Sequence, residues 1–130
     1  MTTVAQKSAR RVALDGINVG DVIYGIAGGG QQKILLVVES DARHIVARHI
    51  TSQGTVEFDR DGFSIRAPNR GSCRITSTAA LPLAERETAV GLDRKMRTAR
   101  QHPDFVLNES EKRLILTGPA FFEAHPLPEI

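Results

Sequence analysis

The sequence predicts an α+β fold that is mainly β: a small antiparallel, SH3-like β-barrel or bent sheet followed by two or three C-terminal helices. Between residues 12 and 78 the apolar segments are short, rich in Val and Ile, and separated by Gly, Asp, Asn or Pro, as strands and their turns are. No stretch of helical periodicity interrupts them, which argues against parallel strands joined by crossover helices. From Pro82 onward, apolar residues instead recur at steps of three and four, the spacing of amphipathic helices.

Length and patterning together predict the domain organisation. The 130 residues fit one domain, and a chain of this size buries about two-thirds of the surface that its unfolded form exposes. Residues 1–10 are polar and unpatterned, so we expect a mobile N-terminal tail. Residues 11–130 are expected to form a single domain, with the barrel part in 12–80 and the helical part in 81–130.

Six or seven short strands are expected in the barrel part. The apolar run Ile34–Val38 is continuous, which indicates a central strand with both faces buried. Asp61–Gly62 is a typical hairpin turn, and the three glycines of 28–30 fit a flexible hairpin loop. Closure of such strands into a barrel removes exposed edges. The expected strands are 12–14, 22–26, 32–38, 43–50, 55–58, 63–66 and 73–77.

Two helices and one further turn are expected in the helical part. The apolar stripe predicts a helix from Pro82 to about Arg100, with proline well suited to its first turn. Asn108 and Glu111 fit a capping box, so a second helix should run over 109–116 and end at Gly118–Pro119. The stripe of the first helix consists of Ala89, Leu92, Met96 and Ala99.

Composition excludes several classes of protein. The net charge is only +2, so a strongly basic nucleic-acid-binding surface is not expected over the whole chain. The single cysteine, Cys73, rules out an intrachain disulfide and a zinc site with two or more thiolates. The longest apolar run is far below the ~18 residues of a membrane span, so we expect a cytoplasmic protein with no membrane partner. No cofactor is expected.

An arginine-rich segment is the first candidate binding site. Arg60, Arg66, Arg70 and Arg74 fall within one short stretch and are opposed there only by Asp61. The planar guanidinium fork suits phosphate or carboxylate recognition, so these four residues are candidates for anion or nucleic-acid contact. The alternative is that the acidic residues of the preceding strand neutralise them across the hairpin.

The strand over 43–50 contains the sequence Ala-Arg-His-Ile twice, five residues apart. Because side chains alternate along a strand, Arg43 and His49 share one face and His44 and Arg48 share the other. The two histidines therefore cannot chelate one metal ion. Arg43 and Arg48 are added to the candidate anion contacts, and the alternative is a strand whose polar residues are only solvated.

Basic residues also gather late in the first C-terminal helix, where the helix dipole favours cations. On the helical wheel Asp93 lies near Arg86, Arg97 and Arg100. A surface charge network accounts for this cluster, and a partner-binding face is the alternative.

The motifs of phosphate-binding loops, calcium loops and catalytic centres are absent. The glycines of 28–30 are not followed by Gly-Lys-Ser/Thr, and Phe63 stands where a calcium loop needs an oxygen ligand. Gly-x-Ser-x-Gly and His-Glu-x-x-His do not occur. Cys73 lies in a predicted strand and is expected to be a small buried side chain rather than a nucleophile.

The leading functional prediction is a non-catalytic binding or regulatory module that contacts another protein. Phe121 and Phe122 are neighbours on a short helix, so they cannot both face one direction. We expect one of them to be buried in a homodimer contact or against the barrel. The first alternative is a nucleic-acid-binding barrel that uses the arginine-rich hairpin. The second is a small enzyme with an unrecognised site, which the missing motifs disfavour.

Overall fold

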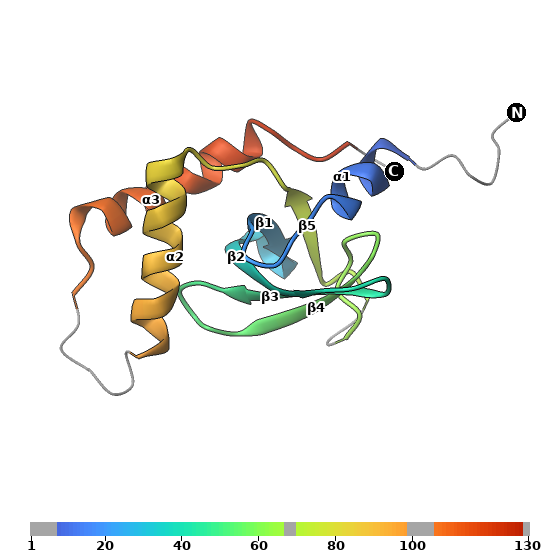
Figure 1. Cartoon of the computed structure of the whole chain (residues 1–130), viewed down its shortest axis with the longest axis horizontal. Helices are drawn as coiled ribbons and strands as arrows, with labels where there is room; N and C mark the ends of the chain where they lie inside the picture. The colour runs from blue at the N-terminus through green and yellow to red at the C-terminus, as the bar shows by residue number, and fades with distance from the viewer. Residues whose placement is uncertain (1–7, 67–69, 99–105, 129–130) are drawn as a thin grey trace, which may run out of the picture.

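The computed structural model describes residues 8–66, 70–98 and 106–128. Five antiparallel strands form a curled half-barrel, with α1 at one end and α2 and α3 on its outer side (Figure 1). The predicted class, mainly β with a curled antiparallel sheet followed by helices, is confirmed. The strands are β1 (Val22–Ala27), β2 (Gln31–Ser40), β3 (His44–His49), β4 (Thr55–Asp59) and β5 (Cys73–Ser77). The helices are α1 (Ala9–Asp15), α2 (Leu83–Arg97) and α3 (Glu109–Glu123), and Gly28–Gly30 forms the short turn η1.

The sheet has the strand order β4-β3-β2-β1-β5, and neighbouring strands are antiparallel. Residues 62–65 lie between the two edge strands and bond to both. Towards β4, Ile65 N donates to Glu57 O (2.9 Å). Towards β5, Ser64 N donates to Cys73 O (2.8 Å). This segment therefore closes one part of the gap between β4 and β5.

The prediction of a regular strand at 63–66 is wrong, and the sheet has five strands instead of six or seven. Gly62, at φ 87°, turns the chain, and the Gly62 N–Asp59 O hydrogen bond (3.0 Å) confirms the predicted turn. After this turn the segment bonds to both edges instead of pairing along one strand. Its two isolated bridges are Phe58↔Ser64 and Phe63↔Arg74.

The prediction of a strand at 12–14 is also wrong, because these residues lie in α1. Ser8 caps the helix, and its hydroxyl accepts a hydrogen bond from Arg11 N (3.1 Å). Leu14 is fully buried while Val12 is exposed. Three apolar residues do not distinguish a short strand from one turn of helix; the serine cap is the local signal that favours the helix.

The N-terminal tail was expected to reach residue 10, but Ser8–Arg10 belong to the fold. Arg10 is buried, and its Nη2 donates to Ile75 O (2.9 Å) while its Nε donates to Asp61 O (3.0 Å). These bonds attach α1 to β5 and to the turn after β4. Residues 1–7 lie outside the described part of the chain.

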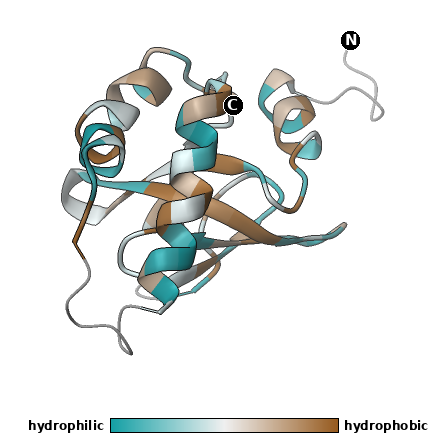
Figure 2. Cartoon of the chain, turned by 60° about the vertical axis from the view of Figure 1, so that its left-hand side comes forward, coloured by the Kyte–Doolittle hydropathy of each residue, from teal (hydrophilic) through white to brown (hydrophobic). Residues whose placement is uncertain are grey.

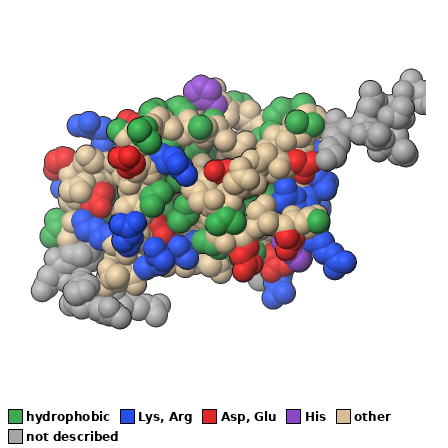
Figure 3. All heavy atoms as spheres, in the orientation of Figure 1, with side chains coloured by type: hydrophobic (Ala, Val, Ile, Leu, Met, Phe, Trp, Pro, Cys, Tyr) green, Lys and Arg blue, Asp and Glu red, His purple; other side chains and the backbone are tan. Residues whose placement is uncertain are grey.

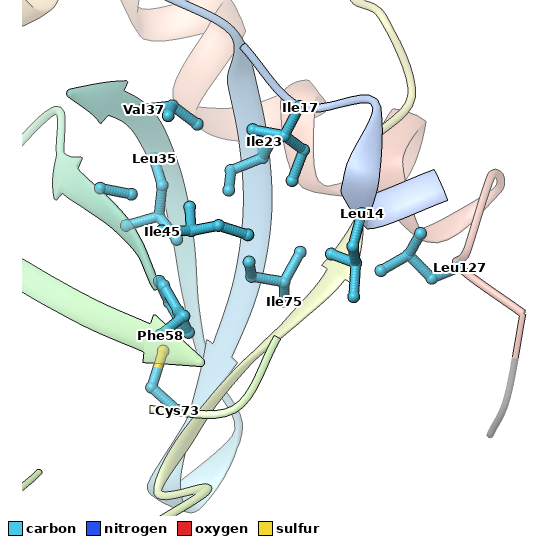
Figure 4. Close-up of a cluster of buried hydrophobic side chains, with 11 residues drawn as sticks. Leu14, Ile17, Ile23, Leu35, Val37, Ile45, Phe58, Cys73, Ile75 and Leu127 are labelled. Carbon is cyan, nitrogen blue, oxygen red and sulfur yellow. The ribbon is translucent and has the colours of Figure 1, made fainter. Parts of the chain in front are cut away.

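Two hydrophobic cores lie on the two faces of the sheet. Ile34–Val37 of β2 are buried and alternate between the cores, and Val38 is half-buried, so the predicted burial on both faces is confirmed for the first four. Inside the curl, the side chains of α1 and the strands point toward one another (Figure 4). This inner core consists of Leu14, Ile17, Ile23, Leu35, Val37, Ile45, Ala47, Phe58, Cys73, Ile75 and Leu127.

The outer core joins the sheet to α2 and α3. Hydrophobic and hydrophilic residues alternate along α2, which crosses in front of the sheet (Figure 2). Ala89 and Leu92 of the predicted stripe are fully buried and Met96 is partly buried, while Ala99 lies outside the described residues. The outer core consists of Val22, Tyr24, Ile34, Leu36, Ile50, Leu81, Ala89, Leu92, Leu114 and Phe122.

α3 begins as predicted but ends later. The capping box is confirmed: Glu111 N donates to Asn108 Oδ1 and Asn108 N donates to Glu111 Oε1, both at 2.8 Å. The predicted end at Gly118–Pro119 is wrong, since the helix continues to Glu123. A Cβ on Gly118 would lie 3.0 Å from Ile34 Cδ1, so the glycine lets α3 approach β2 closely. This packing outweighs the hydrogen bond that Pro119 cannot donate.

Candidate functional site

The arginine-rich segment does not form one binding patch. Arg60 is committed to the fold: its Nη2 donates to Leu14 O (2.9 Å) and its Nη1 donates to Ser40 Oγ (3.2 Å). Its side chain is only 10% exposed. Arg60 therefore joins α1 to the end of β2 and is not available to a ligand.

Arg70 and Arg66 behave differently from each other. Arg70 Nε donates to Asp59 Oδ2 (2.9 Å), and its guanidinium lies 4.8 Å from the centre of the Phe63 ring. The neutralisation across the hairpin that we considered as the alternative therefore holds for Arg70. Arg66 is 81% exposed, and its nearest carboxylate contact is 3.9 Å from Glu57. Arg66 is therefore the more accessible of the two, because its ion contact is longer and its side chain is more exposed.

Arg43 and Arg74 are exposed at separate places, in the turn between β2 and β3 and on β5. Basic and acidic side chains are interspersed over the face of the molecule in Figure 3. The candidate anion contacts thus lie on several different elements of the fold.

Arg48 is committed to an ion pair with α2. Its Nε and Nη2 each donate to one carboxylate oxygen of Asp93 at 2.9 Å. Gln53 Nε2 also donates to Asp93 (3.1 Å), and Arg97 lies 3.4 Å away. Burial opposes ionisation of Asp93, but the hydrogen bonds from Arg48 and Gln53 outweigh it and hold the pKa of its carboxyl below the usual value.

The prediction that Asp93 belongs to a surface charge network is wrong, because its main partner is Arg48 of β3. Asp93 is fully buried and pairs with β3, because α2 turns this position toward the sheet. Arg97 does contact it, as expected from their spacing. Arg86 instead donates to Gly20 O (3.1 Å), and Arg100 lies outside the described residues.

Phe122 packs against the barrel, which is one of the two placements we expected. It is fully buried, and its ring stacks on Tyr24 with centroids 5.3 Å apart. Phe121 is half-buried and contacts the Phe122 ring edge-on at 5.5 Å.

A cleft with a volume of about 600 Å³ lies at the open end of the half-barrel. Cys73, which lies at one end of the inner core in Figure 4, is one of its lining residues. The β1–β2 hairpin, the start of β4 and the residues before β5 form its walls. It is lined by Ala27, Gly28, Gln31, Lys33, Val46, Thr55, Val56, Glu57, Ser64, Arg66, Ser72 and Cys73. We call this hollow the open-end cleft.

The backbone edge of β4 is unpaired where it borders the open-end cleft. The bridging segment 62–65 pairs with β4 only as far as Glu57, which accepts from Ile65 N. In an antiparallel strand, alternate residues direct both N–H and C=O to the same side. Thr55 therefore directs its backbone groups outward as Glu57 does, and no segment of the described chain pairs with them there.

Lys33 supplies the positive charge inside the cleft. It lies two residues before Leu35 on β2, so it continues the inner face of the strand. Its side chain is half-buried, and it makes no ion pair within the described residues. Burial raises the pKa of the Cys73 thiol, and the Lys33 ammonium only partly offsets this effect. The thiol therefore stays protonated near neutral pH, which disfavours it as a nucleophile.

The polar side chains around Lys33 complete the wall. Ser64 Oγ lies 3.2 Å from Ser72 Oγ and accepts from Cys73 N (3.0 Å). Glu57 is held near His44 (3.6 Å) and Arg66 (3.9 Å), and alternation turns its side chain away from Val56. The cleft thus combines an apolar interior with a few convergent polar groups, as ligand sites do.

From the sequence, Arg66 was a candidate contact and the segment from Gly28 to Lys33 was a flexible hairpin loop that could close over a ligand, but neither Lys33 nor Thr55 was assigned to a site. One local signal was present: a lysine continues the inner face of an otherwise apolar strand. The exposed edge of β4 had no sequence signal, because it depends on where the bridging segment stops.

The described residues contain no group of three His, Cys, Asp or Glu side chains placed to hold a metal ion. None of the described helices has the length and apolar character required to cross a bilayer. No protein-family model, curated protein or solved structure matches this chain significantly.

Proposed function

We propose that this protein is a non-catalytic binding module that holds an extended segment of a protein partner in the open-end cleft. The observation that carries the proposal is the unpaired edge of β4 at Thr55, directly beside a cleft of about 600 Å³. An extended segment added there would bond to the edge as a further strand. It would fill the part of the β4–β5 gap that residues 62–65 leave open.

The dimensions and lining of the cleft support binding rather than catalysis. Its volume lies within the range of about 300–1,000 Å³ that is typical of ligand sites. None of His44, His49 and His125 lines it, and Cys73 is a protonated, buried thiol. Its described walls therefore contain neither a histidine nor an activated thiol, which are common catalytic groups.

Nucleic-acid binding is the weaker alternative. Arg48 and Arg60 are committed to contacts inside the fold, and Arg70 pairs with Asp59. Exposed Arg43, Arg66 and Arg74 remain for phosphate contact, and three separated contacts give a shallow dependence of affinity on salt. A steep fall of DNA-column retention with salt would show more phosphate contacts than these three, and it would favour this alternative over the peptide-binding proposal.

Selection from a random peptide display library tests the proposed function. We expect peptides that bind wild type but not Gly28→Trp. Gly28 lines the cleft and a Cβ built on it meets no atom within 4 Å, so the fold has room for an indole that would block the peptide. Thr55→Pro should also abolish binding, because proline lacks the backbone N–H that would donate to the peptide. The fold should tolerate this proline, since Thr55 lies on an exposed edge strand. Ala120→Trp, on the exposed side of α3, is the matched control and should bind normally.

Two outcomes would overturn the proposal. One is a set of peptides that bind wild type, Gly28→Trp and Thr55→Pro equally well. The other is amide chemical-shift changes that map to α2 and α3 instead of to the cleft.

Cytoplasmic location and homodimer formation are also proposals. The single cysteine as a free thiol is compatible with a reducing compartment. Because Phe122 is already covered by Tyr24, a homodimer contact would have to use the half-buried Phe121.

A further inference from the structure

We infer that the open-end cleft selects a segment carrying an acidic side chain, Asp or Glu, whose carboxylate binds the Lys33 ammonium. The inference rests on the proposed function, because it names the chemistry of the segment that the cleft would hold. It is carried by the position of Lys33, by the absence of an ion pair to Lys33 among the described residues and by the direction in which an added strand places its side chains.

Lys33 lies where a bound segment would meet it. It lines the cleft on the inner face of β2, beyond Leu35 and near the Cys73 thiol. Burial and then the charge of Lys33 lower the pKa of His49, which lies opposite Leu35 on β3. A partly buried ammonium without a counter-charge is unfavourable, which favours a ligand that brings a negative charge.

The carboxylates nearest to the cleft are committed elsewhere. Glu57 lines the rim, but its side chain contacts His44 and Arg66. Asp59 accepts hydrogen bonds from Arg70 and from the backbone of the following turn. No ion pair to Lys33 occurs within residues 8–66, 70–98 and 106–128. A carboxylate on the occupant would supply the counter-charge that these described residues do not provide.

The walls around Lys33 suit the rest of an acidic side chain. Val56 and Cys73 offer apolar surface to its methylene groups, and the Ser64–Ser72 hydroxyl pair lies in the same wall. A strand added to the edge of β4 directs alternate side chains inward. One inward side chain can thus place its carboxylate on Lys33, while exposed Arg66 at the rim attracts the acidic segment.

Butyrate is a direct probe of the carboxylate site, and butyramide is its uncharged control. We expect butyrate to shift the amide signals of Gly28, Lys33, Val56 and Cys73, with butyramide shifting them at least tenfold less at equal concentration. Lys33→Met should abolish the butyrate shifts, whereas Lys33→Arg should retain them. Lys112→Met, which removes an exposed lysine of α3, is the matched control and should behave as wild type.

Inorganic phosphate separates a carboxylate site from a general anion site. Phosphate that shifts the same amides more strongly than butyrate would overturn the inference in favour of a phosphate ligand. The absence of any butyrate shift in wild type would overturn it as well. If Lys33→Met does not fold, loss of the butyrate shifts in Lys33→Arg would contradict the assignment, because the positive charge is kept.

Peptides from the display selection give the second test. We expect an acidic residue at one fixed position, and its change to the amide should weaken binding to wild type by about tenfold but leave binding to Lys33→Met unchanged. Selected peptides without a common acidic position would overturn the inference and leave the proposed function standing. Butyrate binding without any selected peptide would instead contradict the proposed function.

Discussion

Replacing Asp93 by alanine removes the buried ion pair between α2 and β3. The Asp93 side chain is 1% exposed and accepts two hydrogen bonds from Arg48 at 2.9 Å and one from Gln53 at 3.1 Å. Removing one partner of a buried ion pair costs about 3–5 kcal/mol. We expect a loss of about 3 kcal/mol in the free energy of unfolding, because Arg48 is 19% exposed and water partly compensates it.

Urea denaturation followed by far-ultraviolet circular dichroism measures this loss. Arg97→Ala is the control, since Arg97 is 50% exposed and lies 3.4 Å from the same carboxylate. An exposed ion pair contributes about 0.2–1 kcal/mol, so this variant should stay close to wild type. The reasoning is refuted if Asp93→Ala destabilises the protein by no more than Arg97→Ala does.

The same ion pair predicts a dependence of stability on pH. Burial raises the pKa of Asp93, but the hydrogen bonds from Arg48 and Gln53 lower it more, so the folded pKa lies below the unfolded one. The stabilisation is therefore fully present above the unfolded pKa of about 3.9 and is lost as the pH falls through the folded pKa. The difference in unfolding free energy between wild type and Asp93→Ala should be constant near neutral pH and shrink in acid. A difference that grows in acid would contradict this sign.

Three further predictions concern packing and assembly. Leu36→Ala should destabilise the domain by about 2–5 kcal/mol in urea denaturation, since Leu36 is buried in the outer core; a smaller loss would contradict its core role. Gly118→Ala should cost about 1 kcal/mol despite its better helix propensity, because the new Cβ meets Ile34 at 3.0 Å; a stabilised variant would contradict close packing. Sedimentation should show a homodimer at micromolar concentration that Phe121→Ser dissociates, and a monomeric wild type would contradict the dimer.

The elements that the sequence predicts correctly are those whose residues act through local rules. Asn108 and Glu111 formed the expected capping box because both partners lie within one turn. The apolar run of β2 was recognised as a central strand because burial on both faces leaves no polar alternation. Gly62 also follows a local rule, because the positive φ of its turn favours glycine.

The features that the sequence does not predict depend on contacts between distant segments. Asp93 looks like a surface residue on α2 until β3 brings Arg48 against it, 45 residues away along the chain. Arg60 looks available until α1 provides Leu14 O as its acceptor. The open-end cleft exists because residues 62–65 stop pairing at Glu57, and no local pattern records where that pairing ends.

Amide hydrogen exchange at Thr55, with and without a selected peptide, tests the central claim most directly. The claim is that an extended segment bonds to the unpaired edge of β4. We predict fast exchange of the Thr55 amide in the free protein and strong slowing when the peptide is bound. The Ile65 amide, which already donates to Glu57 O, should change little. Bound peptide that leaves the Thr55 amide exchanging as fast as before would contradict the account.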